Sequence, residues 1–351
     1  MSAHPTRPLA AALATGLTLA SLLGSTALAQ STDLPEINLA LASTDANFNP
    51  TTGSIFRIAQ DMGFYEKHGV KVNVVTLDGT PQAVAALNSG AVDVADITIE
   101  SAIRLRAEND VPIRGITAVS SGSAFLMAAK DDIETVEDLA GRSFAIADSG
   151  SLDHNLTVAV LNSYDIPTDA PNFVAIGAPD IRVQALAAGQ VDATTVSFGT
   201  YQSIADVEGI HVLVDADDFA ERSPGQAKFV AALEPTIEAK RDALQRFTDA
   251  LADAARAMQN DPATWEAAIA AARDDLSPEA ISATAALNTS RWCVNGCMNP
   301  DNLAAAVEFA YANPEFAEIA PVPLDELVDL SFNEKMLENL GVFEGDVLDK
   351  R

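Results

Sequence analysis

Short segments rich in apolar and β-branched residues alternate with helical stretches of about ten residues along most of the chain. The segments with strand character lie near residues 37–41, 70–75, 92–97, 113–119, 143–147, 172–176, 192–196 and 210–214. Successive parallel strands need a long crossover connection, and a helix is its usual form. The alternation therefore predicts an α/β fold in which mostly parallel sheets carry helices on both faces.

Two segments, 120–129 and 223–230, look like crossings between separate parts of the fold. Each leaves a strand-rich block through Gly, Ser or Pro and continues as a short extended apolar stretch. We therefore expect an inserted lobe of residues 123–230 and a discontinuous lobe made of residues 30–122 and 231–351. Two connecting strands of this kind would act as a hinge.

The charge balance excludes two classes of partner. The 351 residues contain 21 Lys and Arg against 50 Asp and Glu, so the formal net charge is −29. A strong polyanion repels nucleic acid and anionic lipid surfaces. We therefore expect neither nucleic acid nor an anionic lipid surface among its general partners. The protein is also expected to be a monomer.

The first 29 residues have the pattern of a secretory signal peptide. Arg7 precedes an uncharged run over residues 9–23, and Ala27-Leu28-Ala29 forms an A-x-A cleavage site. The apolar run is too short to span a bilayer. We expect residues 1–29 to be removed and the mature protein to lie in the periplasm.

Cys293 and Cys297 are the only two cysteines of the chain. In an oxidising compartment a close pair more often forms a disulfide than a metal site, and no second cysteine or histidine pair completes a zinc site. Asn295-Gly296 between them supplies a turn. We expect a local disulfide, with free thiols or a metal as alternatives.

Four segments carry a resemblance to a known family. Residues 63–72 read Gly-Phe-Tyr-Glu-Lys-His-Gly-Val-Lys-Val, and residues 82–95 form a helix that ends in Ala-Leu-Asn-Ser-Gly before Val-Asp. Residues 182–193 repeat this helix–Gly–Val–Asp pattern, and residues 133–146 contain Asp-Leu-Ala-Gly-Arg followed by a strand. The chain resembles, over residues 37–230, the substrate-binding proteins of ABC importers for nitrate, sulfonates, taurine and thiamine-pyrimidine precursors.

The resemblance implies a type II periplasmic-binding-protein fold with two lobes, a cleft and a two-strand hinge. It also implies that the protein captures a small molecule and delivers it to an importer permease in the inner membrane. The alternatives are an enzyme of the thiamine-pyrimidine type on the same fold and a periplasmic sensor that docks on a membrane receptor.

Catalytic motifs are scarce. The sequence has no GxSxG, HExxH, P-loop or GxGxxG pattern, and His68, His154 and His211 are the only histidines after residue 29. Pyrimidine-synthase relatives carry a Cys-rich motif and a cofactor lysine, and this chain has no Cys-rich run. We expect a protein that is not an enzyme and holds no cofactor.

Candidate ligand-binding residues follow the carboxyl ends of the expected strands, where helix N-termini supply free N–H groups. The first lobe contributes Asp45, Asn47, Phe48, Thr80, Gln82, Thr98, Glu100 and Ser121. The inserted lobe contributes Ser149, Ser151, His154, Ser197, Phe198 and Tyr201.

Several of these candidates have a plain structural alternative. Ser149 and Ser151 lie between a strand and a helix, so either can be an ordinary helix N-cap as well as a ligand contact. Phe48, Phe198 and Tyr201 can stack on a flat ligand or fill the lobe cores.

The charged candidates leave the ligand open. Asp45 and Glu100 are either solvated charges at helix starts or acceptors for an amino group, His154 lies at the rim or in the site, and Arg182 is expected on the surface. Two carboxylates argue against a bare small anion such as nitrate. An amine-, amide- or heteroaromatic-bearing molecule, or a sulfonate-like anion, remains as the expected ligand.

Overall fold

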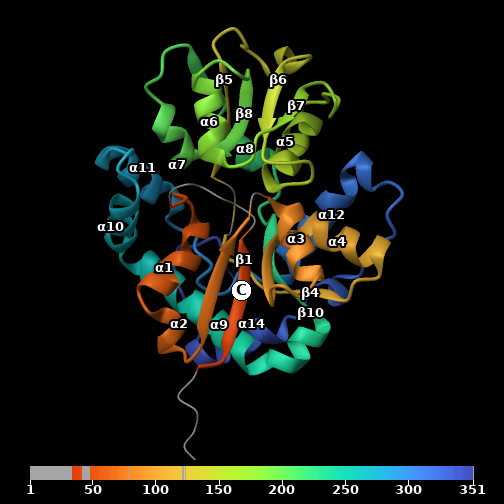
Figure 1. The fold of residues 1–351 in the computed structure, drawn as a ribbon, viewed down its shortest axis with the longest axis vertical. Helices are drawn as coiled ribbons and strands as arrows, with labels where there is room; N and C mark the ends of the chain where they lie inside the picture. Colours follow the sequence, from red (N-terminus) through yellow and green to blue (C-terminus); the bar gives the residue numbers. More distant parts are fainter. Residues whose placement is uncertain (1–33, 42–47, 78, 121, 123, 351) are drawn as a thin grey trace, which may run out of the picture. The chain divides into compact units, whose positions relative to one another are not determined.

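The computed structural model describes residues 34–41, 48–77, 79–120, 122 and 124–350 and contains two five-stranded sheets (Figure 1). The first sheet has the strand order β2-β1-β3-β10-β4. Its strands are β1 (Glu36–Leu41), β2 (Lys71–Thr76), β3 (Val94–Thr98), β4 (Ile113–Thr117) and β10 (Lys228–Leu233). The second sheet has the order β7-β6-β8-β5-β9. Its strands are β5 (Phe125–Lys130), β6 (Ser143–Ile146), β7 (Asn172–Ala175), β8 (Ala193–Ser197) and β9 (Ile210–Val214).

Both sheets are mixed, which corrects the expectation of mostly parallel sheets. The pairs β1–β2, β1–β3, β6–β7 and β6–β8 are parallel. By contrast, β10 runs antiparallel between β3 and β4, and β5 runs antiparallel between β8 and β9. These two strands follow the chain crossings, so each crossing enters the interior of the sheet it joins.

The helices cover both faces of each sheet, as the alternation predicts. Those between the strands of the first sheet are α1 (Ile55–Asp61), α2 (Phe64–Lys67), α3 (Thr80–Asn88) and α4 (Ile99–Asn109). Those between the strands of the second are α5 (Leu152–Ser163), α6 (Pro179–Ala187), α7 (Phe198–Tyr201) and α8 (Ala216–Arg222). Short 3₁₀ turns are η1 (Thr52–Ser54), η2 (Val136–Leu139), η3 (Gln202–Ile204) and η4 (Pro314–Phe316).

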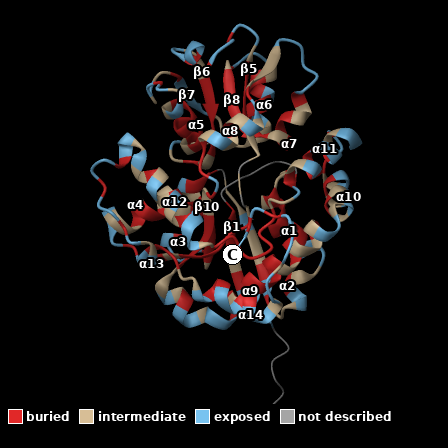
Figure 2. Cartoon of the chain, turned by 180° about the vertical axis from the view of Figure 1, so that it is seen from behind, coloured by how far each residue is buried: buried red, intermediate tan, exposed pale blue. Residues whose placement is uncertain are grey.

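Side chains of each strand alternate between two cores. In β1, Ile37 and Leu39 pack with α1 and α9, while Ala40 packs with α3 and α4 on the opposite face. In β5, Met127 faces α5 and α8, while Leu126 faces α6 and α7. The inner strands are accordingly buried, whereas the edge strands β2, β7 and β9 are partly exposed, as are the outer faces of the helices (Figure 2). The period-2 pattern is that of a sheet covered on both sides.

The C-terminal segment is helical and packs on the first sheet. It comprises α9 (Glu234–Asn260), α10 (Pro262–Ala272), α11 (Pro278–Asn288), α12 (Pro300–Ala312), α13 (Leu324–Leu327) and α14 (Ser331–Leu340). α9 contacts β1, β4 and β10, and α14 lies along α9. α11 also contacts α7, which follows a strand of the second sheet.

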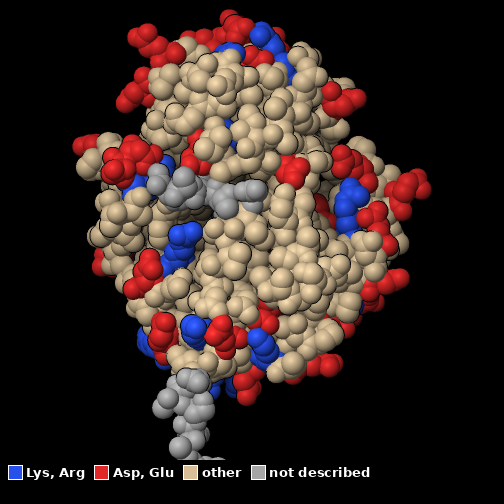
Figure 3. Space-filling view, viewed as in Figure 1, with Lys and Arg blue, Asp and Glu red and all other residues tan. Residues whose placement is uncertain are grey.

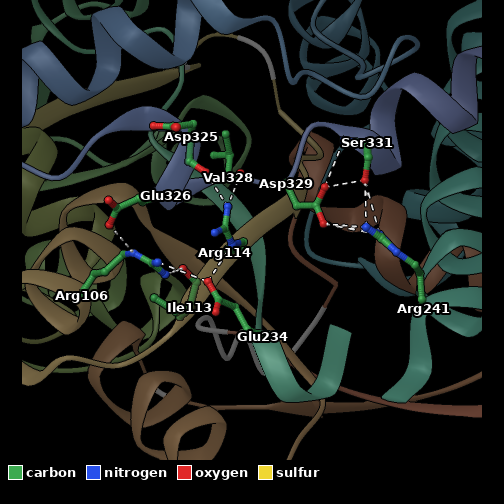
Figure 4. A network of polar contacts seen from close by, with 10 residues as sticks. All are labelled: Arg106, Ile113, Arg114, Glu234, Arg241, Asp325, Glu326, Val328, Asp329 and Ser331. Atoms are coloured by element: carbon green, nitrogen blue, oxygen red, sulfur yellow. Dashed lines mark hydrogen bonds and ion pairs between the residues drawn. The ribbon is translucent and has the colours of Figure 1, made fainter. Parts of the chain in front are cut away.

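A network of arginines and carboxylates fastens the C-terminal segment to the first sheet (Figure 4). Glu234, at the start of α9, accepts from Arg114 Nε at 2.8 Å and from Arg106 Nη2 at 3.2 Å. Arg106 Nε also lies 3.6 Å from Glu326 near α13, and Arg241 Nη2 donates to Asp329 at 3.0 Å. The hydrogen bond from Arg114 is the main reason that the pKa of Glu234 is lowered.

Two short segments carry the chain between the sheets. Residues 118–124 connect β4 to β5, and residues 223–227 connect α8 to β10. The N–H of Gly122 donates to the carbonyl of Gly225 at 2.7 Å, so the two crossings are hydrogen-bonded to each other.

Within the described part of the chain, no helix combines the length and the apolar character needed to cross a membrane. Acidic side chains occupy much of the border of the face in Figure 3, whereas its centre is largely uncharged.

Candidate functional site

A cavity lies where the loops of the two sheets meet. Its empty volume is about 1250 Å³, with the space at its open mouth included. Most of the lining residues lie at or after the carboxyl ends of β1, β2, β6, β7 and β8. The others are Asp96 of β3, Val119 and Ser120 of the first crossing, and Phe125 and Lys228, which begin β5 and β10. Ligands of open α/β sheets bind at this end of the strands.

The segment after β1 forms one wall of the cavity. Phe48 is largely buried and lines the wall together with Thr52 and Ser54. Arg273, which is buried in the C-terminal part, donates to the carbonyl oxygen of Phe48 at 3.1 Å, and Trp265 Nε1 donates to Ser54 Oγ at 2.9 Å. The C-terminal helices therefore hold this wall in place, a role that requires contacts more than 200 residues apart in sequence.

The start of α5 forms the opposite wall. Ser151 stands at the N-cap position, but its side chain makes no capping hydrogen bond. The residue is only 2% exposed, lines the cavity, and its Oγ has no hydrogen-bond partner among the described residues. An enclosed hydroxyl without a partner is costly unless a ligand or water supplies one. Ser151 is thus available for a ligand.

The described lining of the cavity contains more positive than negative side chains. Lys228 forms an ion pair with Asp96, and Arg182 Nη2 lies 3.7 Å from Asp153 Oδ2. Arg57 is exposed at the cavity, its guanidinium carbon is 6.0 Å from the centre of the Phe48 ring, and it forms no ion pair with any described residue. Among the described residues that line the cavity of this strongly acidic protein, one positive charge therefore remains unbalanced.

Arg182 is buried, which corrects the expectation of a surface position. It is 3% exposed, and its guanidinium donates to the carbonyl oxygens of Gly177 at 2.6 Å and Thr195 at 3.2 Å. Asp153 in turn accepts from the N–H of Ala147 at 2.8 Å. A buried guanidinium requires such partners, and these lie on different strands and loops of the second sheet.

Three of the candidates from the sequence line the cavity: Phe48, Ser151 and Ser197. Ser197 Oγ accepts from the N–H of Thr200 at 3.1 Å and therefore also caps α7. Asp45, Asn47 and Ser121 lie outside the described residues, as does the expected signal peptide, residues 1–29.

Other candidates have structural partners away from the cavity lining. Thr98 caps α4 by accepting from the N–H of Ser101 at 3.2 Å. Tyr201 is buried in the core beneath α6, and Phe198 packs partly buried against the same core. Ser149 is exposed.

His154 stabilises a loop. Its Nδ1 accepts from the N–H of Gly150 at 3.1 Å, and its ring centre lies 4.7 Å from that of Phe173 in an edge-to-face arrangement. Burial lowers the pKa of His154. The side chain is therefore held as a neutral acceptor.

Thr80 and Gln82 belong to the first turns of α3, which faces the start of α5. Gln82 Nε2 donates to Asp148 Oδ2 at 3.2 Å. A Cβ atom placed on Gly79 would lie 2.6 Å from Ser151 Oγ, so the two loops are in close contact. Thr80 is buried, and its Oγ1 has no partner among the described residues.

Glu100 lines a second hollow, which contains Asn155 and Ser163 of α5, Arg222 of α8 and Asn313 of the loop after α12. Its Oε2 is enclosed and has no hydrogen-bond partner among the described residues. Burial raises the pKa of Glu100 to about 7, against the opposite effects of a backbone hydrogen bond, Asn155 and Arg104. Glu100 therefore lies between elements of the two sheets and not in the larger cavity.

Cys293 and Cys297 form a disulfide in the structure. Of the described side chains, one group places three potential metal-ligand atoms within 4.8 Å of one another, namely Cys293, Cys297 and Asp349. Two of the three are engaged in the disulfide, so this group is not a metal site in the oxidised protein.

The residues missed by sequence reasoning are mainly charged. Arg57, Asp96, Asp153 and Lys228 line the cavity, but none follows a strand at the position used to select candidates. Asp153 lies only two residues beyond Ser151, and Arg57 lies within a helix that opens directly after the Phe48 loop. Asp153 lies between the candidates Ser151 and His154, so it is within reach of the same reasoning, and extending the Phe48 loop into α1 would have found Arg57.

Comparisons with known proteins agree with this fold. Residues 51–265 match the family model described as NMT1/THI5 like. A protein of Brucella abortus (strain 2308), named as a candidate binding protein, is 27% identical over 186 residues, which span 53% of this chain and 57% of that relative. The chain thus covers less than two thirds of its curated relative.

Two solved structures share the arrangement of elements. The alkanesulfonate-binding protein SsuA of Xanthomonas axonopodis pv. citri, bound to MOPS, has a TM-score of 0.67 at 18% identity, with 85% of this chain and 97% of that chain covered. A Candida albicans protein described as having the generic periplasmic binding protein fold has a TM-score of 0.63 at 17% identity, with 87% and 95% covered. The expected α/β periplasmic-binding-protein fold is confirmed.

Proposed function

Because the chain belongs to the NMT1/THI5-like family, we propose that it is the periplasmic substrate-binding protein of an ABC importer and that it captures a small organic acid. The observation that carries the choice of an acid is Arg57, an arginine at the cavity without an ion-pair partner among the described residues. The enclosed hydroxyl of Ser151, which has no hydrogen-bond partner in the described part of the chain, offers a neutral donor on the opposite wall. A carboxylate or sulfonate can accept from both.

The aromatic ring of Phe48 adds an apolar surface beside the cation. Phe48 lines the cavity next to Arg57, so the ligand's organic part would pack on the ring while its acid group faces the guanidinium. The two carboxylates among the described lining residues, Asp96 and Asp153, are already matched by Lys228 and Arg182 and so do not require an amino group on the ligand. This favours the sulfonate-like alternative over an amine. The similar SsuA protein, which binds alkanesulfonates, points the same way.

We further propose that the ligand is enclosed by movement of two lobes, residues 123–230 against residues 30–122 and 231–351. The crossings 118–124 and 223–227 would serve as the hinge. A ligand that contacts Arg57 on one lobe and Ser151 on the other binds the closed form more tightly and therefore favours it. The closed form is what an inner-membrane permease would recognise.

Titration calorimetry tests the site. Native mass spectrometry first identifies any small molecule that copurifies with the protein. The purified protein is then titrated with MOPS, taurine, benzoate and the matched amine benzylamine. We expect an acid to bind and the Arg57→Met variant to lose about 10- to 100-fold in affinity, the usual effect of a charge-assisted hydrogen bond. Arg142→Met, which removes an equally cationic side chain far from the cavity lining, serves as the control.

Unchanged affinity in Arg57→Met, or tight binding of the amine alone, would contradict the proposal. The enzyme alternative predicts that the bound compound is recovered chemically altered, and mass spectrometry of the released ligand decides this. The sensor alternative predicts capture of a membrane receptor domain instead of a permease.

A further inference from the structure

The two crossings are contacted from one side by a structure built from distant parts of the chain. We call it the clasp and define it as the disulfide turn, residues 293–297, together with the C-terminal tail, residues 342–350. The N–H of Ala118, in the first crossing, donates to the carbonyl of Gly296 at 3.2 Å. A Cβ atom on Gly122, in the same crossing, would lie 3.2 Å from Leu348 Cδ1, so the tail packs directly on this glycine.

Hydrogen bonds join the two parts of the clasp. The buried carboxylate of Asp349 accepts from the N–H of Asn295 at 2.6 Å and from the N–H of Cys297 at 3.1 Å. The Asn295 side chain donates to the carbonyl of Phe343 at 3.1 Å and accepts from its N–H at 2.8 Å. The tail is thus attached to the turn at both of its ends.

The disulfide gives the turn the shape that these bonds require. Gly296 and Cys297 both have positive φ, +87° and +51°, and such a conformation is unfavourable for a residue with a side chain. The covalent link between Cys293 and Cys297 closes this turn. The N–H groups of Asn295 and Cys297 then converge on one carboxylate.

Restraint of the first crossing also restrains the second. The N–H of Gly122 donates a hydrogen bond to the carbonyl of Gly225, so a restraint on the first crossing is passed to the second through this hydrogen bond. Leu348 is an apolar residue that is 49% exposed, and its Cδ1 is the atom nearest to a Cβ placed on Gly122. The Leu348 side chain therefore restricts the movement of Gly122 toward the C-terminal tail.

We propose that the clasp braces the two crossings and thereby sets how readily the lobes move. The consequence for ligand capture rests on the proposed function, but the bracing itself does not. Releasing the tail should make the crossings open more often while the second sheet keeps its stability, because the buried residues of the clasp, among them Val294, Cys297 and Val347, pack in the cores of the first sheet.

Hydrogen exchange of the full-length, ligand-free protein tests the brace. Amide exchange is followed by mass spectrometry in peptides that cover residues 113–124 and 223–230, with residues 193–201 of the second sheet as an internal reference. Leu348→Ala removes the packing on Gly122, and we expect exchange in both crossing peptides to rise about five- to tenfold, in keeping with the loss of roughly 1 kcal/mol of apolar contact. The reference peptide should not change.

Val342→Ala is the matched control, because Val342 lies in the same tail and is 45% exposed, close to the 49% of Leu348. The double variant Cys293→Ser/Cys297→Ser provides a second test, with a larger increase expected in the same two peptides. Equal exchange in Leu348→Ala, Val342→Ala and the wild type would overturn the brace. An increase that appears equally in residues 193–201 would also overturn it, since it would indicate general destabilisation.

The test separates this inference from the proposed function. Exchange is measured without ligand, so failure to bind any acid leaves the result intact and refutes only the function. Conversely, a protein that binds an acid while its crossings are unaffected by Leu348→Ala refutes only the clasp.

Discussion

Replacing Glu100 by glutamine should stabilise the protein at alkaline pH and have little effect near pH 4.5. Glu100 lies at the start of α4, and its Oε2 is enclosed against α5 with no hydrogen-bond partner among the residues that the structure describes. Burial raises the pKa of this carboxyl from 4.5 to about 7. A raised carboxyl pKa means that the folded protein binds the proton more tightly than the unfolded chain, so the wild type loses stability as the pH rises from 4.5 to 7.

The magnitude follows from the size of the shift. A difference of about 2.5 pKa units corresponds to about 3 kcal/mol at 1.36 kcal/mol per unit. Glutamine keeps the shape and carries no charge, so Glu100→Gln should unfold with a free energy about 3 kcal/mol above the wild type at pH 8 and about equal to it at pH 4.5. With an unfolding entropy of about 2.1 cal/mol/K per residue over roughly 320 residues, the midpoint should rise by about 4 °C at pH 8.

Urea unfolding followed by circular dichroism from pH 4.5 to pH 8 measures this difference. Glu108→Gln is the control, because Glu108 is exposed on the same helix and should change stability by less than about 0.5 kcal/mol at every pH. If Glu100→Gln gives the same small difference at all pH values, or destabilises the protein at pH 8, Glu100 is ionised in a favourable environment and the reasoning from burial is refuted.

Two other substitutions test the cavity and its walls. Gly199→Ala places a Cβ atom 2.6 Å from the carbonyl oxygen of Pro50, so we expect about tenfold weaker binding of the preferred acid in calorimetry; an unchanged affinity would show that the two loops need not meet. Arg182→Met removes the partner of the buried Asp153 and should lower the free energy of unfolding in urea by about 3–5 kcal/mol. If the double variant Arg182→Met/Asp153→Asn loses more stability than Arg182→Met alone, the pairing of these two residues is refuted.

Local sequence patterns predict where the strands lie but not the direction in which they pair. Short apolar runs locate strands such as β1, β3 and β6, since the side chains on both faces of these strands are buried. The direction in which β5 and β10 pair is not encoded in their own residues. It depends on where each crossing returns to its sheet, and this is a property of the whole topology.

The same limit applies to the site. Ser197 ends β8 and Ser151 lies in the loop between β6 and α5, so both could be located because strand ends gather at one edge of a sheet. Arg182 could not be placed correctly, because its burial depends on carbonyl oxygens of Gly177 and Thr195 that reach it only in the folded second sheet. Glu100 lies beside its predicted loop, but a neighbouring helix encloses it in a different hollow.

The position of β10 has a consequence for the order in which the chain can fold. β3 and β4 do not pair with each other, because β10 lies between them and is the strand that joins them. All strands of the second sheet lie within residues 125–214, so that sheet can form from a continuous stretch. The first sheet must wait until residues 228–233 return from it, and contacts between such distant residues form slowly. A growing chain would therefore complete its second sheet before its first, and one that stops at residue 227 would leave β4 without a partner strand.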